Sequence, residues 1–316
     1  MNKKLQLTSH ILMVQPVKFG YNKATAFSNA FQNRSFLNVN VQEKALMEFH
    51  HFSSLLQQEG IDVLIVEDTP EPHTPDSIFP NNWITTHDDG TIYLYPMETP
   101  NRRSERREDL IHLLKKQFLV TQVKDLSYME AHGHYLEGTG SMVFDRVNRI
   151  SYACLSPRTH QDALHEFSSL SGYKPVSFHA LGPEGKAVYH TNVMMYVGEA
   201  FAVVCLQAIP DREEVEILIR SLKSTGKEII EISTHQMSCF AGNLIQLISR
   251  QGEKLLVLSR RAFDSLNHEQ KVSLEKHGRM VTPSLQMIED CGGGSARCMI
   301  AEIHLPALPM PHFQGL

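Results

Sequence analysis

Apolar and polar positions follow one pattern five times along the chain. Each occurrence has a short polar loop and an apolar strand; in the first four, a turn leads into a second apolar strand, as at Asp88, Asp89 and Gly90. Short apolar runs bounded by turn residues are typical of β-hairpins. The five segments cover residues 79–95, 136–154, 189–205, 240–258 and 294–303.

Between these segments, apolar residues recur every three to four positions, which is typical of helices. The predicted helices cover residues 41–59, 103–117, 160–170, 212–224 and 269–277. A short strand follows each helix, for example at 62–66 and 228–232. Each repeat unit is therefore predicted to contain one helix and three strands.

The loop that opens each unit carries a polar residue or a cysteine at an equivalent position. These residues are Asn82, Glu137, His190, Asn243 and Cys298, separated by 55, 53, 53 and 55 residues. Like units that stack radially leave their equivalent loops around one axis. We therefore expect a single α/β domain over residues 1–316, a five-bladed α/β propeller with pseudo-fivefold repeats, rather than an ordinary sheet with coincidental spacing. Strand 11–14, which no helix precedes, is expected to pair with the last unit and close the ring.

Composition excludes several classes of protein. Hydrophobic residues make up 42% of the chain, charged residues 21%, and the net charge is −5. This balance is typical of a globular protein and offers no basic face for nucleic acid. No stretch is long and apolar enough for a membrane span. The five cysteines include no CxxC pair, which argues for free thiols in a reducing compartment and predicts a cytoplasmic protein.

Cys298 is the strongest candidate for chemistry. It follows three glycines at 292–294, which permit close approach of a ligand and leave backbone amides available to a developing charge. A thiol nucleophile needs a proton carrier, and His190 lies in phase with it. Glu137, also in phase, is expected to accept a hydrogen bond from the substrate. Cys154 and Cys205 lie in apolar strands and are expected to be core residues.

Other polar residues have weaker signals. Asn81, Asn82 and Asp76 either form a turn or bind substrate, and Arg102 is either a surface residue or a partner for a substrate carboxylate. His132 and His134 suggest a metal, but no further ligand has matching spacing. The chain has no nucleotide-binding glycine motif and no HExxH sequence. We therefore predict no cofactor and no metal.

Four short stretches that contain the candidate residues, at 76–82, 136–138, 190–192 and 292–298, resemble motifs of the guanidine-modifying (pentein) superfamily. This superfamily includes arginine deiminase, dimethylarginine dimethylaminohydrolase, agmatine deiminase and the amidinotransferases. The resemblance implies a catalytic set of Cys298, His190 and Glu137. It further implies substrate binding by residues of the first, third and fourth units, namely Asp76, Asn81, Asn82, Arg102, Asn192 and Asn243.

Two positions depart from the guanidinium-binding members of the superfamily. Asn82 and Asn192 stand where those enzymes usually carry acids. An amide offers a donor and an acceptor to a neutral ureido group, whereas a guanidinium favours carboxylates. The overall pattern is most similar to the citrulline utilization hydrolases. The expected reaction is therefore citrulline to ornithine, ammonia and carbon dioxide.

Alternative functions remain open from the sequence. The same residues would serve a guanidino hydrolase of the arginine deiminase or dimethylargininase type, or an amidinotransferase. A propeller can also be a non-catalytic binding module, because fold alone does not imply chemistry. The expected partner is a small amino-acid substrate, without nucleic acid or membrane. The oligomeric state is left open, with a homodimer as one form.

Overall fold

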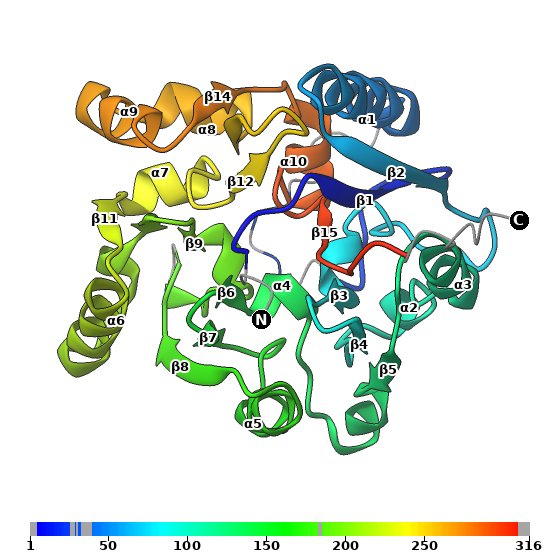
Figure 1. The fold of residues 1–316 in the computed structure, drawn as a ribbon, viewed down its shortest axis with the longest axis horizontal. Coiled ribbons are helices and arrows are strands. Elements are labelled where there is room, and N and C mark those ends of the chain that lie inside the picture. Colours follow the sequence, from blue (N-terminus) through cyan, green and yellow to red (C-terminus); the bar gives the residue numbers. More distant parts are fainter. Residues whose placement is uncertain (1–4, 26–28, 30, 33–39, 183–184, 309–316) are drawn as a thin grey trace, which may run out of the picture.

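The computed structural model describes residues 5–25, 29, 31–32, 40–182 and 185–308. These residues form five three-stranded sheets. The sheets are arranged around a centre at which the short helix α4 (Gly138–Ser141) lies (Figure 1). The predicted α/β class and its five repeated units are confirmed.

Every sheet has the same internal order. An antiparallel pair is extended by a third strand that runs parallel to the middle one. The sheets contain β15 (Ala301–Ile303), β1 (His10–Gln15) and β2 (Asp62–Glu67); β3 (Ile84–Thr86), β4 (Thr91–Leu94) and β5 (Gln122–Asp125); β6 (Val143–Asp145), β7 (Ile150–Leu155) and β8 (Lys174–His179); β9 (Met195–Val197), β10 (Phe201–Val204) and β11 (Glu228–Glu231); and β12 (Ile245–Ile248), β13 (Lys254–Val257) and β14 (Arg279–Val281).

Residues from the two ends of the described chain share one sheet. Strand β1 pairs with β15 in antiparallel register, with His10 opposite Ile303 and Leu12 opposite Ala301. This pairing was predicted from the missing helix before the first strand. The last strand of the chain therefore completes the sheet that the first strand begins.

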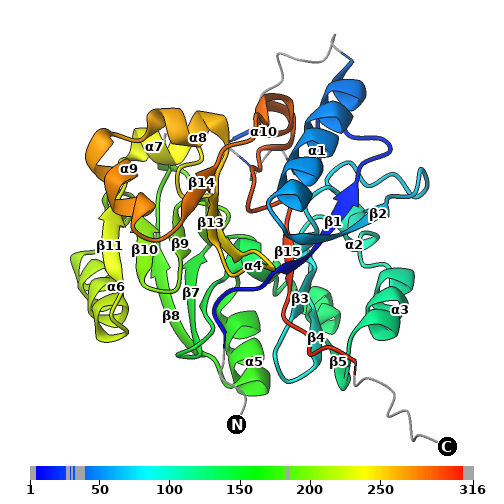
Figure 2. The same cartoon turned by 45° about the horizontal axis from the view of Figure 1, so that its top comes forward.

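Helices connect the middle and third strands and cover the outside of the sheets (Figure 2). They are α1 (Val41–Gln58), α3 (Glu108–Gln117), α5 (Gln161–Ser171), α6 (Arg212–Ser224), α8 (Arg260–Ser265) and α9 (His268–Glu275). Further helices are α2 (Pro100–Arg103), α7 (Thr234–Ser238) and α10 (Gln286–Gly292). The 3-10 helices are η2 (Pro80–Asn82), η3 (Ser127–His132), η5 (Thr191–Val193) and η6 (Leu206–Ala208).

One predicted helix is divided. The sequence predicted a helix over 103–117, but α2 ends at Arg103 and α3 begins at Glu108. The chain leaves the helical conformation between them, and Arg107 is extended, with φ of −97° and ψ of 123°. Arg103 donates to the carbonyl of Met97, and Arg106 pairs with Glu130 at 2.6 Å.

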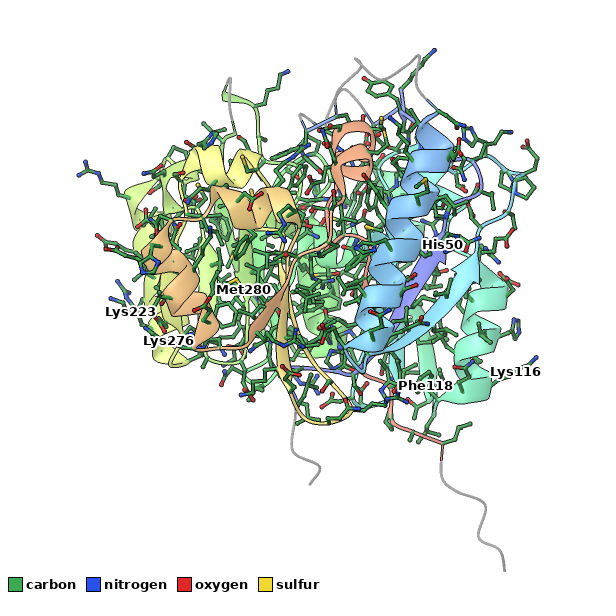
Figure 3. All side chains as sticks on the ribbon, turned by 90° about the horizontal axis from the view of Figure 1, so that it is seen from above. His50, Lys116, Phe118, Lys223, Lys276 and Met280 are labelled. Atoms are coloured by element: carbon green, nitrogen blue, oxygen red, sulfur yellow. The ribbon has the colours of Figure 1, made fainter. Side chains whose placement is uncertain are left out.

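The helices bury one face and expose the other. In α1, Ala45, Phe49, Phe52 and Leu56 recur at helical spacing and are all 0% exposed. Lys116, Lys223 and Lys276 lie at the outer rim of the molecule (Figure 3). Within the described residues, no helix is long and apolar enough to cross a membrane.

Candidate active site

Equivalent loops of the repeats bring the in-phase residues together. Each residue lies just before the first strand of its sheet: Asn82 ends η2, Glu137 precedes α4, and His190 precedes η5. Direct contacts join neighbouring units, since His190 bonds to Glu137 and Asn243 bonds to Cys298. The expectation that these loops meet at one place is met by the geometry.

A narrow cavity lies at this junction. Its wall contains five of the predicted site residues, namely Asp76, Asn82, Arg102, His190 and Cys298, and also Asn29, Phe79, Arg158, Tyr189, Gly292, Gly293 and Gly294. Glu137, Asn81, Asn192 and Asn243 lie behind this wall and contact the lining residues. The predicted set therefore divides into residues that face a ligand and residues that hold them.

Asn243 holds Cys298 in place by hydrogen bonds to its side chain and backbone. Its Nδ2 donates to the Cys298 sulfur at 3.1 Å, while its Oδ1 accepts from the backbone N–H groups of Arg297 at 3.1 Å and Cys298 at 3.4 Å. Asn192 Oδ1 lies 3.8 Å from the same sulfur. Burial raises the pKa of the Cys298 thiol, and the bonds from Ser295 and Asn243 offset part of that rise. The resting group is a neutral thiol, so attack must be coupled to removal of its proton.

Glycines let the cysteine loop pack tightly. Gly293 ends α10 with φ of 68°, a left-handed conformation that suits glycine. A Cβ on Gly294 would lie 2.8 Å from the Phe79 ring and 3.2 Å from the Cβ of Cys298. The glycines that marked Cys298 in the sequence therefore allow this loop to pack closely against Phe79 and Asn29.

His190 and Glu137 form a buried pair at 2.8 Å between Nε2 and Oε2. Burial would raise the pKa of Glu137, but Arg158 at 3.5 Å, His190 and Arg102 at 3.7 Å lower it to about 2. Burial lowers the pKa of His190 to about 4 despite the carboxylate. The pair is therefore an ionised Glu137 and a neutral His190, in which Nε2–H donates and Nδ1 keeps its lone pair.

The free face of His190 is held close to Asn82. A Cβ on Gly140 would lie 2.8 Å from His190 Nδ1 and closer still to Asn82 Nδ2. Only glycine at this position lets α4 pass both side chains without displacing one of them. The absence of a side chain at Gly140 thus leaves the space that both His190 and Asn82 occupy.

Arg102 lies in the cavity wall and is already paired. Its Nε and one terminal nitrogen each donate to Glu105 at 2.9 Å, and the other terminal nitrogen donates to Asn82 Oδ1 at 2.9 Å. This two-pronged bond fixes the guanidinium plane. Glu105 was not predicted as a site residue, because it is one of several charges of both signs between residues 102 and 109. A substrate carboxylate at Arg102 would share that cation with Glu105.

Asp76 presents an unused acceptor. Its Oδ2 accepts from Asn22 Nδ2 at 2.8 Å, and Arg102 Nε lies 3.7 Å away. Its Oδ1 is buried and has no hydrogen-bond partner within the described part of the chain. A buried carboxylate oxygen without a donor is costly, so this atom is suited to an N–H group of a ligand.

Asn81 connects units and does not line the cavity. Its Nδ2 donates to the carbonyl of Cys298, and its Oδ1 lies 3.2 Å from Asn82 Nδ2 and 3.3 Å from Asn192 Nδ2. One amide therefore ties together the first, third and last units. This geometry favours a positioning role over the substrate contact expected from the sequence.

Arg158 is a further cavity residue that the sequence analysis missed. It is 1% exposed, one terminal nitrogen donates to the carbonyl of Thr25 at 3.2 Å, and its guanidinium lies 5.0 Å from the centre of the Tyr189 ring. Arg102 follows Asn82 by 20 residues, and Arg158 follows Glu137 by 21. Extending the repeat beyond the loop positions would have identified it.

Acid is expected to destabilise the protein because it must charge buried histidines. Burial lowers the pKa of His190 and of His304 to about 4, with Arg146 adding to the effect at His304. The unfolded rings titrate near the ordinary value of 6.5. Between these values the unfolded state binds more protons, so stability is present above pH 6.5 and is lost as the pH falls toward about 4.

We expect the free energy of unfolding to fall by roughly 2 kcal/mol per histidine between about pH 7.5 and about pH 5. Thermal melts across this range would measure it. The His304→Asn variant removes one titrating ring outside the cavity and should show a smaller fall. An equal Tm at both ends of the range would contradict burial of neutral rings.

Solved structures of similar fold include enzymes that act on arginine derivatives. The N-terminal domain of ArgZ, an arginine dihydrolase from the ornithine–ammonia cycle in cyanobacteria, has been solved bound to substrate; it is 16% identical, with a TM-score of 0.74 over 95% of this chain and 99% of that one. A longer ArgZ chain is 17% identical, with the same TM-score. The aligned region is 95% of the present chain but only 41% of the longer ArgZ chain.

Another similar structure is dimethylarginine dimethylaminohydrolase from Pseudomonas aeruginosa, solved as a Cys-to-Ser variant with citrulline. It is 15% identical, with a TM-score of 0.65 over 94% of this chain and 99% of that one. At these identities the likeness establishes the fold. No curated protein matches the chain by sequence.

A family model described as "N,N dimethylarginine dimethylhydrolase, eukaryotic" matches residues 15–305. Apart from residues 10–14 of β1, the match covers all five sheets, and it includes every residue around the cavity named above. The chain therefore belongs to this family, within the guanidine-modifying (pentein) superfamily.

Proposed function

We propose that the protein is a cysteine-dependent hydrolase of a ureido or guanidino amino acid, and that citrulline is its preferred substrate. The observation that carries the proposal is the cavity lined by Cys298 and by the neutral His190, whose Nε2 is bonded to the ionised Glu137 behind the wall, with asparagine at positions 82 and 192. A nucleophile, a proton carrier and an orienting carboxylate are the parts that covalent hydrolysis requires.

In the first step, the Cys298 sulfur attacks the central carbon of the ureido group. Its proton passes to Nδ1 of His190, the ring nitrogen that Glu137 leaves available. The imidazolium then gives the proton to the terminal nitrogen, the C–N bond breaks, and ammonia leaves. The product is a thiocarbamate that links Cys298 to the side-chain nitrogen of the substrate. Glu137 stabilises the transient positive charge on His190.

In the second step, His190 accepts a proton from water as the water attacks the same carbon. The C–S bond breaks and the proton returns to the sulfur, which leaves a carbamic acid on the side-chain nitrogen. This acid divides into carbon dioxide and an amine, so citrulline yields ornithine. No step requires a group beyond Cys298, His190, Glu137 and water.

The cavity supplies charges for the two ends of an amino acid. Arg102 and Arg158 both line it and provide positive charge for a carboxylate. Asp76 provides an unpartnered oxygen for an N–H donor. Asn82 offers its amide between these groups and the base, where a neutral ureido group can use both a donor and an acceptor.

A second candidate is a guanidino hydrolase, such as an arginine dihydrolase or a dimethylargininase. Asp76 favours it, since an unpaired buried carboxylate oxygen also suits a guanidinium. ArgZ is an arginine dihydrolase, and the Pseudomonas aeruginosa enzyme was solved with citrulline. An amidinotransferase would use the same covalent step but pass the carbon to an amine instead of water.

Mass spectrometry of the trapped intermediate tests the proposal. The protein is mixed separately with citrulline, arginine, agmatine and a methylarginine, quenched in acid, and digested. We expect a covalent adduct on the peptide that contains Cys298 with citrulline, while the Cys239 peptide stays unmodified and serves as control. A non-catalytic binding module would give no adduct with any of the four, and an adduct with arginine but not citrulline would favour the second candidate.

A further inference from the structure

A cluster of two histidines and an aspartate lies outside the catalytic cavity. His134 follows η3, and His160 and Asp162 begin α5. One ligand atom from each lies within 4.8 Å of the other two. Figure 1 shows α5 at the edge of the molecule, away from α4 at the centre. The sequence analysis found no third ligand for His134, because the fold brings the partners from 26 and 28 residues along the chain.

The backbone beneath the cluster is fixed by hydrogen bonds. The His160 N–H donates to the carbonyl of Tyr135 at 2.7 Å, and Leu136 pairs with Thr159 in an antiparallel bridge. His134 and His160 therefore start from two segments held in register. Their rings stack at 3.9 Å between centres and are 9° from parallel. Both imidazoles thus reach the same side of the surface.

The donor atoms have spacings close to those of a metal site. Asp162 Oδ2 lies 3.6 Å from His134 Nδ1 and 3.9 Å from His160 Nδ1. With metal–ligand bonds near 2.1 Å, the edge of a tetrahedral zinc site is about 3.4 Å. His160 Nδ1 accepts a hydrogen bond from the N–H of Asp162 at 3.2 Å, so this nitrogen is unprotonated, and it would exchange that bond for one to the metal.

We propose that His134, His160 and Asp162 form a binding site for a divalent transition-metal ion of the zinc class. Two imidazole nitrogens and a carboxylate are a ligand set that zinc prefers, and water completes the coordination. The two rings must turn out of their parallel stack so that the ion lies in the plane of each. Their side chains are 28% and 42% exposed, which leaves room for that turn. His132, with its ring centre 6.2 Å from that of His134, can replace the water.

A bound ion would connect the loop after η3 to the first turn of α5. Because the ion binds the folded arrangement, it should raise the thermal stability of the protein. Zinc chloride is the probe, titrated into the purified full chain by calorimetry and followed in parallel by thermal melts in a buffer without thiols or chelators. We expect saturable binding at micromolar zinc and a higher Tm.

Matched variants assign that binding to the cluster. His134→Gln and Asp162→Asn should each weaken zinc binding at least tenfold and remove the rise in Tm. His165→Gln changes an exposed histidine on the same helix outside the cluster, and should leave both unchanged. The Tm of each variant without zinc shows that the variant is folded. Zinc binding that persists in both cluster variants, or no binding by the unaltered chain at micromolar zinc, would overturn the proposal.

Discussion

Replacing Cys298 with serine is expected to reduce turnover at least about a thousandfold, because removal of a nucleophile that acts with a base loses most of the catalysis. A serine hydroxyl is a much weaker nucleophile than a thiol when its proton must be passed to the same base. Serine is close in size to cysteine, so Asn243 can still donate to the new oxygen as it now donates to the sulfur. The variant should therefore stay folded and still bind substrate.

Steady-state assays and thermal melts on the same preparations measure the two effects. Cys239→Ser is the matched control for activity, since Cys239 is only partly buried and lies outside the cavity. Cys154→Ser and Cys205→Ser are controls for stability, because both thiols are 0% exposed and burial raises their pKa to about 12 and about 11. We expect these two to lower Tm more than turnover. Substantial activity in Cys298→Ser would refute a covalent route through this residue.

The spacing of polar residues predicted the fold because every unit has the same order of loop, strands and helix. The loop before the first strand of each sheet must face the centre, so Asn82, Glu137, His190, Asn243 and Cys298 meet regardless of what each one does. The same logic predicted that β1 pairs with β15, since a unit that lacks a first helix must complete another. Period and patterning are therefore sufficient for the topology.

The repeat spacing could not predict which site residues line the cavity and which hold other residues in place. Asn81 and Asn82 are neighbours in sequence, yet Asn82 faces the cavity while Asn81 bonds to the Cys298 carbonyl. Arg102 is joined to Glu105 by two hydrogen bonds, which a run of mixed charges does not reveal. These assignments depend on side-chain directions in short turns, where one residue changes the face that is presented.

Long-range partners outside the repeat were also hidden. Asp76 accepts from Asn22, 54 residues earlier, and the His134 cluster depends on residues at the start of α5. The sequence around Asp76 or His134 does not indicate which distant residues contact it. Arg158 is different, because its offset from Glu137 nearly equals that of Arg102 from Asn82. It was recoverable by applying the repeat to every position of the unit.

Citrulline is expected to be hydrolysed with a higher kcat/KM than arginine. The polar groups nearest the sulfur are the neutral amides of Asn192 and Asn243. Glu137 offers little to a cation, because Arg158, His190 and Arg102 already compensate its charge. A guanidinium would then depend on Asp76 alone, and burying an incompletely paired charge costs several kcal/mol. Assays with citrulline, arginine, agmatine and a methylarginine measure the preference, and higher kcat/KM for any of the last three would favour the second candidate.

The double change Asn82→Asp with Asn192→Asp is expected to shift this preference toward cationic substrates by roughly 1–3 kcal/mol, the range for one charge-assisted hydrogen bond from each carboxylate.

The same double change is also expected to lower the catalytic rate. Both amides now donate to Asn81 Oδ1 at 3.2 and 3.3 Å, and carboxylates cannot. An acid at 82 would pair with Arg102, and an acid at 192 would disfavour a thiolate on Cys298. We therefore expect kcat to fall for every substrate while the ratio of arginine to citrulline rises. The single variants separate the two effects, and an unchanged ratio in all three folded variants would show that these asparagines do not set the preference.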